Sequence, residues 1–230
     1  MQQIVAMGGG GWMMDDPALD GAVLALTDAR RPRICFMPTA SGDHPRSERF
    51  LEAFPAAGFD ASILRLFDRE VADIDAFLGE QDVVYVGGGN TVSMLAVWRA
   101  HGVDRALRAA YDAGTVMAGM SAGANCWFEA STTDSYQLGR ADPLLDGLGF
   151  VPGSFTPHYD SEPARRPAVI EHVASGTLPP GFACDDYAAV HLVDGVLAQA
   201  LRSRPHARAL RVAPGDGGTR EEPLETRMVT

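Results

Sequence analysis

Short apolar runs alternate with stretches in which apolar positions recur every three or four residues. The apolar runs cover residues 3–7, 33–37, 62–66, 82–86 and 115–118, and the periodic stretches cover 20–27, 46–57, 71–78 and 91–110. Uniformly apolar short runs are typical of parallel strands covered on both faces, and the periodic stretches fit the helices that cover them. The alternation predicts an α/β fold with a doubly wound, mostly parallel sheet.

The second half of the chain has a different pattern of residues. Six prolines between residues 152 and 180 interrupt any long element, and the last forty residues read as short strands joined by turns at Asp194-Gly195 and Asp216-Gly217-Gly218. No linker separates the halves, and 230 residues suit a single core. We therefore expect one domain over residues 1–230 with a short β-rich C-terminal region.

Charge and composition narrow the range of functions. The chain has 19 Lys and Arg against 30 Asp and Glu, a net charge of −11, which argues against a nucleic-acid partner. No apolar run approaches the roughly 20 residues that span a bilayer, so no membrane partner is expected. The first residues lack the features of a secretion signal, which predicts a cytoplasmic protein. Three cysteines without a CxxC pair predict neither a disulfide framework nor a zinc ribbon.

The strongest local feature is a serine between two glycines. An apolar run leads into Gly119-Met120-Ser121-Ala122-Gly123, the Gly-x-Ser-x-Gly pattern of a sharp strand-to-helix turn that presents a nucleophilic hydroxyl. Flanking glycines remove Cβ atoms that would clash in such a turn. The N–H of Ala122 would then point toward a developing oxyanion. A glycine-rich structural turn is the alternative, because the pattern is short.

A second glycine turn also follows an apolar run. Gly87-Gly88-Gly89 precedes Asn90, which can cap a helix. Consecutive glycines expose backbone N–H groups that suit an anion or an oxyanion. The glycine spacing or lysine of a phosphate-binding loop is missing, so we predict that Gly88 and Gly89 contribute to an oxyanion hole. A third glycine turn, residues 8–11, either lines the same crevice or is a plain tight turn.

A serine nucleophile needs a base, and the base needs an acid that orients it. Among six histidines, His158 follows a short apolar segment and lies on a loop that Pro157 stiffens, which makes it the candidate base. Asp134, on a polar loop between Ser121 and His158, is the first candidate acid. Glu129 and Asp160 are alternatives, and each of these carboxylates could instead be solvated.

Together these motifs resemble peptidase family S51, which includes aspartyl dipeptidases and cyanophycinases. The resemblance rests on residues 119–125 (GMSAGAN), 87–91 (GGGNT) and 157–158 (PH), and it spans about residues 3–195. It implies a flavodoxin-like fold similar to class I glutamine amidotransferases. It also implies the same roles for Ser121, His158, Gly88 and Ala122, with the acid on the loop that carries Asp134.

The resemblance extends to substrate binding. In aspartyl dipeptidases of the family, an arginine after the catalytic histidine binds the acidic side chain of the substrate. Arg165 and Arg166 stand in a comparable place, although a solvated helix start is the alternative. Asn90 and Tyr159 complete the candidate substrate-binding residues. A homodimer is a further expectation from the resemblance.

The predicted function is hydrolysis of short peptides through an acyl-enzyme on Ser121, with His158 as general base and no metal or organic cofactor. The activity would be dipeptidase-like, and an N-terminal acidic residue is one candidate preference. Two alternatives stay open. One is an α/β-hydrolase-type esterase, although only 37 positions separate Ser121 from His158. The other is a non-catalytic module that binds a small ligand in the glycine-lined crevice.

Overall fold

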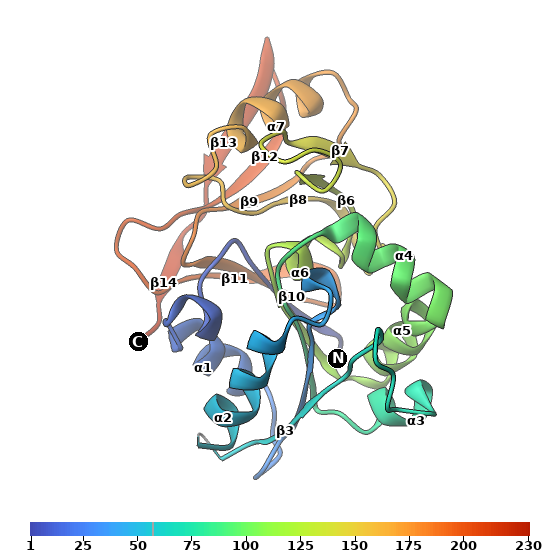
Figure 1. Cartoon of the computed structure of the whole chain (residues 1–230). Coiled ribbons are helices and arrows are strands. Elements are labelled where there is room, and N and C mark those ends of the chain that lie inside the picture. The colour runs from blue at the N-terminus through green and yellow to red at the C-terminus, as the bar shows by residue number, and fades with distance from the viewer. Residues whose placement is uncertain (57) are drawn as a thin grey trace.

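An eight-stranded sheet forms the centre of the molecule (Figure 1). The computed structural model describes residues 1–56 and 58–230. Five neighbouring strands, β1, β5, β4, β2 and β3, run parallel, whereas β10 pairs antiparallel with both β1 and β11. The α/β class is therefore confirmed. In spatial order the strands are β14 (Thr226–Met228), β11 (Val196–Arg202), β10 (Ala188–Val193), β1 (Gln3–Met7), β5 (Val116–Met120), β4 (Val83–Val86), β2 (Arg33–Met37) and β3 (Asp60–Ile63).

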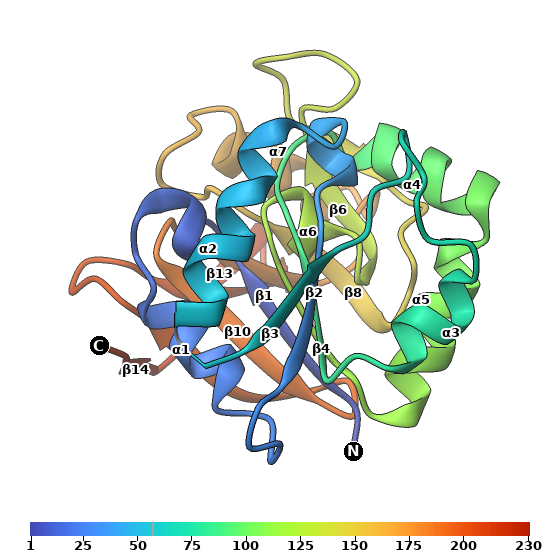
Figure 2. The same cartoon turned by 60° about the horizontal axis from the view of Figure 1, so that its bottom comes forward.

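Helices cover both faces of this sheet. Successive strand residues point to opposite faces, so Val5 and Met7 of β1 pack with α1 and α2, while Ile4 and Ala6 join a core that includes α4 and α5. Figure 2 shows α1 and α2 on one side of the parallel strands and α3 to α5 on the other. The helices are α1 (Ala18–Leu24), α2 (Arg49–Ala56), α3 (Ile74–Gly79), α4 (Thr91–His101), α5 (Val103–Ala113), α6 (Ala122–Asn125) and α7 (Arg165–Ala174), with short 3-10 turns η1 (Trp12–Met14), η2 (Thr39–Ser41) and η3 (Pro45–Glu48).

A second, six-stranded sheet was not predicted from the sequence. Its strands contain prolines and several serines and threonines, and five of these polar residues are buried: Ser131, Thr132, Thr133, Ser154 and Thr156. Their polarity conceals the alternation that usually marks a strand. Helix α7 packs on this sheet, at the top of Figure 1. In spatial order the strands are β13 (Gly218–Pro223), β12 (Ala209–Gly215), β9 (Gly181–Cys184), β8 (Val151–Thr156), β6 (Phe128–Thr133) and β7 (Asp142–Leu144).

The predicted elements differ from the observed ones mainly at their ends. The runs 3–7 and 33–37 coincide with β1 and β2. The stretch 91–110 is divided into α4 and α5 by Gly102, whose φ of 74° ends the first helix in the left-handed conformation. The stretch 46–57 begins as η3 and continues as α2, and its last residue lies outside the described residues.

Both predicted C-terminal turns join antiparallel strands. Asp194 and Gly195, with φ of 49° and 78°, connect β10 to β11, and Asp216-Gly217 connects β12 to β13. Positive φ at both central residues is typical of a type I′ hairpin turn, which fits Asp194-Gly195, whereas in the second turn Gly217 has a positive φ and Asp216 does not.

The largest buried cluster includes Val86 of the first sheet and Phe155 of the second, so one core joins the two sheets. Within residues 1–56 and 58–230, no helix is both long and apolar enough to span a bilayer.

Candidate active site

Ser121 lies at the turn between β5 and α6. Its backbone has φ 56° and ψ −117°, a conformation that non-glycine residues rarely adopt and that stores strain. The Ser121 N–H donates to the carbonyl of Met7 at 3.1 Å, which fixes the turn against the end of β1. The side chain is partly exposed. The strand-turn-helix geometry expected for a nucleophilic serine is therefore present.

The glycines around Ser121 allow two layers of backbone to touch. A Cβ added to Gly123 would lie 2.2 Å from the carbonyl oxygen of Val86, and a Cβ on Gly119 would lie 2.2 Å from that of Gly123. Neither contact can be relieved by rotating a side chain, because backbone atoms form both sides. The two glycines thus let α6 lie directly against β4 and β5.

We expect Gly123→Ala to destabilise the fold by about 1–3 kcal/mol, because the added methyl forces α6 away from β4. The shift also displaces Ser121, so activity should fall beyond the loss of folded protein. Chemical denaturation would measure the first effect. Gly21→Ala in α1 is the matched control: its Cβ meets nothing within 4 Å, and it should be neutral or stabilising by up to ~1 kcal/mol. A Gly123→Ala protein as stable as the wild type would contradict the packing described here.

His158 and Asp186 form a hydrogen-bonded pair. The Nδ1 atom of His158 lies 2.7 Å from Oδ1 of Asp186, and only 17% and 14% of these side chains are exposed. His158 follows β8, and Asp186 follows β9, the parallel neighbour of β8. When Nδ1–H donates to the carboxylate, Nε2 carries the free lone pair of a general base.

The Asp186 carboxylate is held in its ionised form. Burial alone would raise its pKa, but hydrogen bonds from His158 and Ser161, together with the nearby imidazole, give a net lowering. With an unfolded value of about 3.9, a lowered folded pKa stabilises the protein at pH values above that value. This contribution is lost as the pH falls through the folded pKa. Asp186 therefore stays charged across neutral and mildly acidic pH.

The end of β1 brings Ser121 and His158 to the same place. Ser121 hydrogen-bonds Met7, the last residue of β1. Two residues later, a Cβ on Gly9 would lie 3.2 Å from Cε1 of His158 and 2.1 Å from Oδ1 of Asp186. The third glycine turn thus lies beside the His158–Asp186 pair and leaves room for it. No hydrogen bond joins Ser121 directly to His158 among the described residues, and such contacts often close only when substrate binds.

Backbone donors surround the serine. A Cβ on Gly88 would lie 3.2 Å from Cβ and 3.6 Å from Oγ of Ser121, so the second glycine turn passes next to the hydroxyl. In the described part of the chain, the N–H groups of Gly88, Gly89 and Ala122 have no backbone acceptor, whereas Gly87 N–H is bonded to Met37. Free N–H groups beside a nucleophile are the donors that an oxyanion hole needs.

Two of the three acids suggested by the sequence lie elsewhere. Asp134 Oδ1 is 3.5 Å from Nη2 of Arg165, and Glu129 is an exposed residue of β6. The structure pairs His158 with Asp186 in place of either one. The alternative Asp160 supports this pair indirectly, because its Oδ1 accepts from Asp186 N–H at 2.8 Å. The signal in the sequence was weak: Asp186 is one of two aspartates after a short apolar run, 28 positions beyond His158.

The candidate substrate-binding residues fall into two groups. Asn90 and Arg165 line a cavity of about 450 Å³ beside Ser121, together with Asp134 and Glu162. Ser121 itself contributes to this wall, and the volume lies in the range of small-molecule sites. We call this space the acidic cavity, since its charged lining groups are two carboxylates and one guanidinium.

Arg166 and Tyr159 are directed to another part of the molecule. The Arg166 guanidinium binds Glu221 through Nε and Nη2, at 3.0 and 2.7 Å, and the Tyr159 hydroxyl donates to the same carboxylate at 2.6 Å. Tyr159 is buried, and burial followed by the contact with Glu221 raises the pKa of its hydroxyl. These two residues connect α7 and the loop after β8 to β13 and do not line the acidic cavity.

Asn90 and Arg165 are held by local contacts. Asn90 caps α4 by accepting from Ser93 N–H at 2.8 Å and donates to the Ser135 carbonyl at 3.0 Å. The Arg165 side chain is only 3% exposed and binds Glu162 at 2.7 Å through Nε and the Thr132 carbonyl at 2.7 Å through Nη1. With Asp134 near Nη2, each nitrogen of the guanidinium lies close to a protein acceptor. Arg165 therefore forms a fixed part of the wall.

Comparison with known proteins gives consistent matches. The sequence model described as Peptidase family S51 matches residues 4–199. The chain is 45% identical over 234 residues to the uncharacterized peptidase YgaJ of Bacillus subtilis (strain 168), with 100% of both chains covered. It is 34% identical over 133 residues to peptidase E of Streptomyces coelicolor, a match that covers 57% of this chain and 53% of that one.

Solved structures show a similar fold. The crystal structure of a peptidase from an acI-B1 actinobacterium matches with a TM-score of 0.68 at 16% identity, covering 100% of this chain and 96% of that one. At this identity the likeness concerns the fold alone. The family model and the full-length relative settle the assignment, and this chain belongs to peptidase family S51.

Proposed function

We propose that this peptidase is a serine peptidase that cleaves short peptides with a free N-terminus, in the manner of a dipeptidase. One observation carries the proposal. Ser121 lies in the strained turn between β5 and α6 and is hydrogen-bonded to Met7 at the end of β1, and the His158–Asp186 pair, joined at 2.7 Å, adjoins the glycine turn that follows β1. A nucleophile, a base and an orienting acid at one sheet edge are the parts that acyl transfer requires.

The reaction follows from these parts. Nε2 of His158 takes the proton of Ser121 as Oγ attacks the scissile carbonyl carbon. The N–H groups of Gly88 and Ala122, with Gly89 as a further donor, hold the negative oxygen. The C–N bond then breaks, and His158 gives its proton to the departing amine. Water, deprotonated by His158, hydrolyses the ester on Ser121 and restores the enzyme.

Asp186 takes the role that the sequence suggested for Asp134 or Glu129. Its carboxylate contacts Nδ1 of His158 directly and stays ionised because the hydrogen bonds it accepts outweigh the effect of burial. It can therefore fix the tautomer of the ring and stabilise the imidazolium. Asp134 lies at Arg165 and shapes the acidic cavity in this proposal.

A preference for an acidic N-terminal residue has less support. Arg166 is bound to Glu221, and Arg165 is already contacted by Glu162, Asp134 and a backbone carbonyl. A substrate carboxylate placed there would meet two protein carboxylates and a guanidinium with few free donors. We assign the acidic cavity to the amino-terminal residue of the substrate, with a neutral side chain favoured over an acidic one.

The proposal is tested with a substrate panel. We expect hydrolysis of free-N-terminus dipeptides and aminoacyl p-nitroanilides, with p-nitrophenyl acetate cleaved more slowly relative to its intrinsic reactivity. Mass spectrometry after treatment with a fluorophosphonate should locate the label on Ser121. An esterase would cleave only the ester. A module that merely binds ligands would show thermal stabilisation by dipeptides without hydrolysis, and that outcome would reject the proposal.

A further inference from the structure

A second cavity also borders the Gly87-Gly88-Gly89 turn. It measures about 460 Å³ and is lined by Gly87 and Gly88, whereas Gly89 lines the acidic cavity. Gly88 also lies next to the Ser121 side chain, and Ser121 itself lines the acidic cavity. Both cavities therefore border the turn that contacts the nucleophile, one at Gly87 and Gly88 and the other at Gly89.

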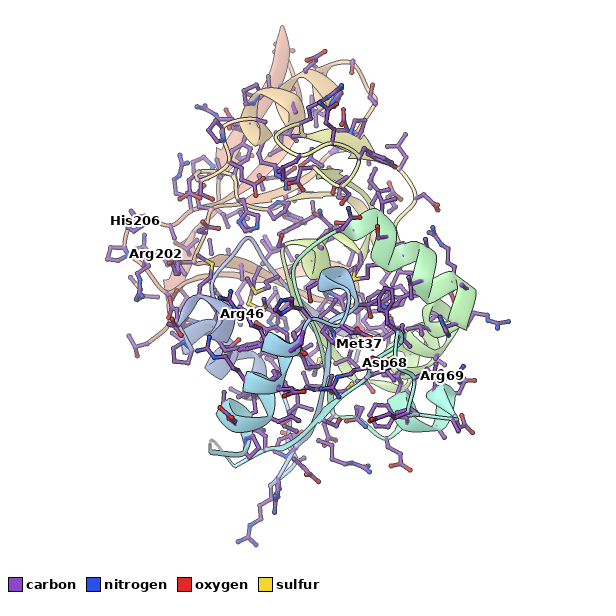
Figure 3. The ribbon with its side chains drawn as sticks, in the orientation of Figure 1. Met37, Arg46, Asp68, Arg69, Arg202 and His206 are labelled. Atoms are coloured by element: carbon purple, nitrogen blue, oxygen red, sulfur yellow. The ribbon has the colours of Figure 1, made fainter. Side chains whose placement is uncertain are left out.

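The ionisable groups that line this second space are all basic. They are His44, Arg46 and Arg49, and no carboxylate is part of the lining. We call it the basic cavity. This is unexpected in a chain with a net charge of −11, where a random surface depression would more often carry carboxylates. Figure 3 labels Arg46 on the segment that leads into α2, on the side of the eight-stranded sheet nearest the six-stranded sheet.

The charges of the basic cavity are available to a ligand. Within residues 1–56 and 58–230, no carboxylate forms an ion pair with Arg46. Arg49 is 3.4 Å from Asp15, but 61% and 84% of these side chains are exposed, so water and salt screen the pair. His44 accepts from Arg46 N–H through Nδ1 at 3.1 Å, which leaves Nε2 free. Two guanidinium groups can thus meet an incoming anion.

The rest of the wall is apolar and aromatic. Trp12 and Phe36 line the cavity and meet edge to face at 5.1 Å. Phe36 is buried and stacks on Phe50, which fixes its position. A surface that combines such rings with guanidinium groups suits a ligand with an apolar side chain and a carboxylate. The residue at the C-terminal end of a peptide has both.

The acidic cavity has the opposite preference. It has two negative charges, on Asp134 and Glu162, and one positive charge, on Arg165, and both carboxylates line the space next to Ser121. A protonated α-amino group is attracted to this arrangement, whereas a carboxylate is repelled. In a dipeptide the ammonium and carboxylate groups are roughly 6 Å apart, since consecutive Cα atoms are about 3.8 Å apart. The two cavities border neighbouring glycines, Gly88 and Gly89, whose Cα atoms are likewise about 3.8 Å apart.

We infer that the basic cavity binds the C-terminal carboxylate and apolar side chain of the leaving residue, so that opposite charges on the two sides of Ser121 orient a zwitterionic dipeptide. This inference rests on the proposed function, because it assigns the leaving-group side of the same site. It names the substrate class as dipeptides with a neutral first residue and an apolar second residue that carries a free carboxylate.

The test compares three substrates that share an N-terminal alanine: Ala-Phe, Ala-Phe amide and alanine p-nitroanilide. We expect kcat/KM for Ala-Phe to exceed that for the amide by about 10-fold or more, because charge-assisted hydrogen bonds are stronger than neutral ones. In R46Q and in the double variant R46Q/R49Q, this ratio should fall by about 10-fold, mainly through KM for Ala-Phe. R31Q makes the same charge change at an exposed arginine outside both cavities and should keep the wild-type ratio.

A binding measurement separates this inference from the proposed function. Trp12 is partly exposed in the basic cavity, whereas Trp98 and Trp127 are fully buried, so a change in tryptophan fluorescence reports occupancy. Ser121→Ala should bind Ala-Phe more tightly than its amide, and R46Q should remove the difference. Cleavage of the anilide with equal rates for Ala-Phe and its amide would overturn the inference and leave the serine peptidase intact. If the wild type cleaved none of the three substrates but still bound Ala-Phe more tightly than its amide, the serine peptidase proposal would be overturned and the carboxylate-binding cavity supported.

Discussion

Ser121→Ala is expected to lower kcat for dipeptide hydrolysis by about 10⁴- to 10⁶-fold without unfolding the protein. The hydroxyl is the proposed nucleophile, and removing a nucleophile that acts as a unit with its base eliminates most of the covalent catalysis. The remaining rate would come from the N–H donors of Gly88 and Ala122, which still stabilise an oxyanion formed by direct attack of water. Steady-state kinetics with Ala-Phe would measure the change.

Two controls accompany this substitution. Ser93→Ala alters an exposed serine of α4 and should retain wild-type kinetics. The melting temperature of Ser121→Ala should equal or exceed that of the wild type, because the strained turn at φ 56° loses none of its backbone contacts. If Ser121→Ala kept more than a tenth of the wild-type kcat, Ser121 would not be the nucleophile.

Asp186→Asn is expected to lower kcat by about 10²- to 10⁴-fold while KM changes little. The asparagine keeps the size of the side chain but cannot balance the charge of the imidazolium, and its amide can donate to Nδ1 and hold the ring in the wrong tautomer. Asp186 lines neither the acidic nor the basic cavity, so the variant should keep its affinity for substrate. Initial rates over a range of Ala-Phe concentrations would separate kcat from KM.

The same assay decides among Asp186, Asp134 and Glu129 as the acid. Asp134→Asn should act mainly on KM, because Asp134 lines the acidic cavity and contacts Arg165. Glu129→Gln should change neither constant, since Glu129 is exposed on β6. A large loss of kcat in Asp134→Asn together with a nearly normal Asp186→Asn would restore the assignment suggested by the sequence.

The second sheet explains why the sequence did not reveal the partner of His158. Strand β8 pairs in parallel with β9, with Thr156 beside Ala183, and the residues that follow each strand emerge at the same edge. His158 and Asp186 therefore meet although 28 positions separate them. The sequence candidates Asp134 and Glu129 lie closer to Ser121 in the chain, whereas the pairing of two short strands rich in small and polar residues leaves no local pattern in the sequence.

The sequence by itself determined the features that depend on local chemistry. Apolar runs identified the parallel strands, and glycines identified turns that need close backbone approach or positive φ, which is why Ser121, Gly88 and Gly89 could be singled out. A histidine on a stiffened loop was similarly visible as a candidate base. Each of these signals lies within a few residues, where sterics and periodicity act directly.

Only the tertiary structure decided which charges meet. It brought Asp186 to His158, placed Arg165 between Asp134 and Glu162, and turned Arg166 toward Glu221. It also set His44, Arg46 and Arg49 around a cavity that borders the same glycine turn as the acidic one. Electrostatic partners act through space over a few ångströms, and strand pairing and helix packing fix those distances between residues far apart in the chain.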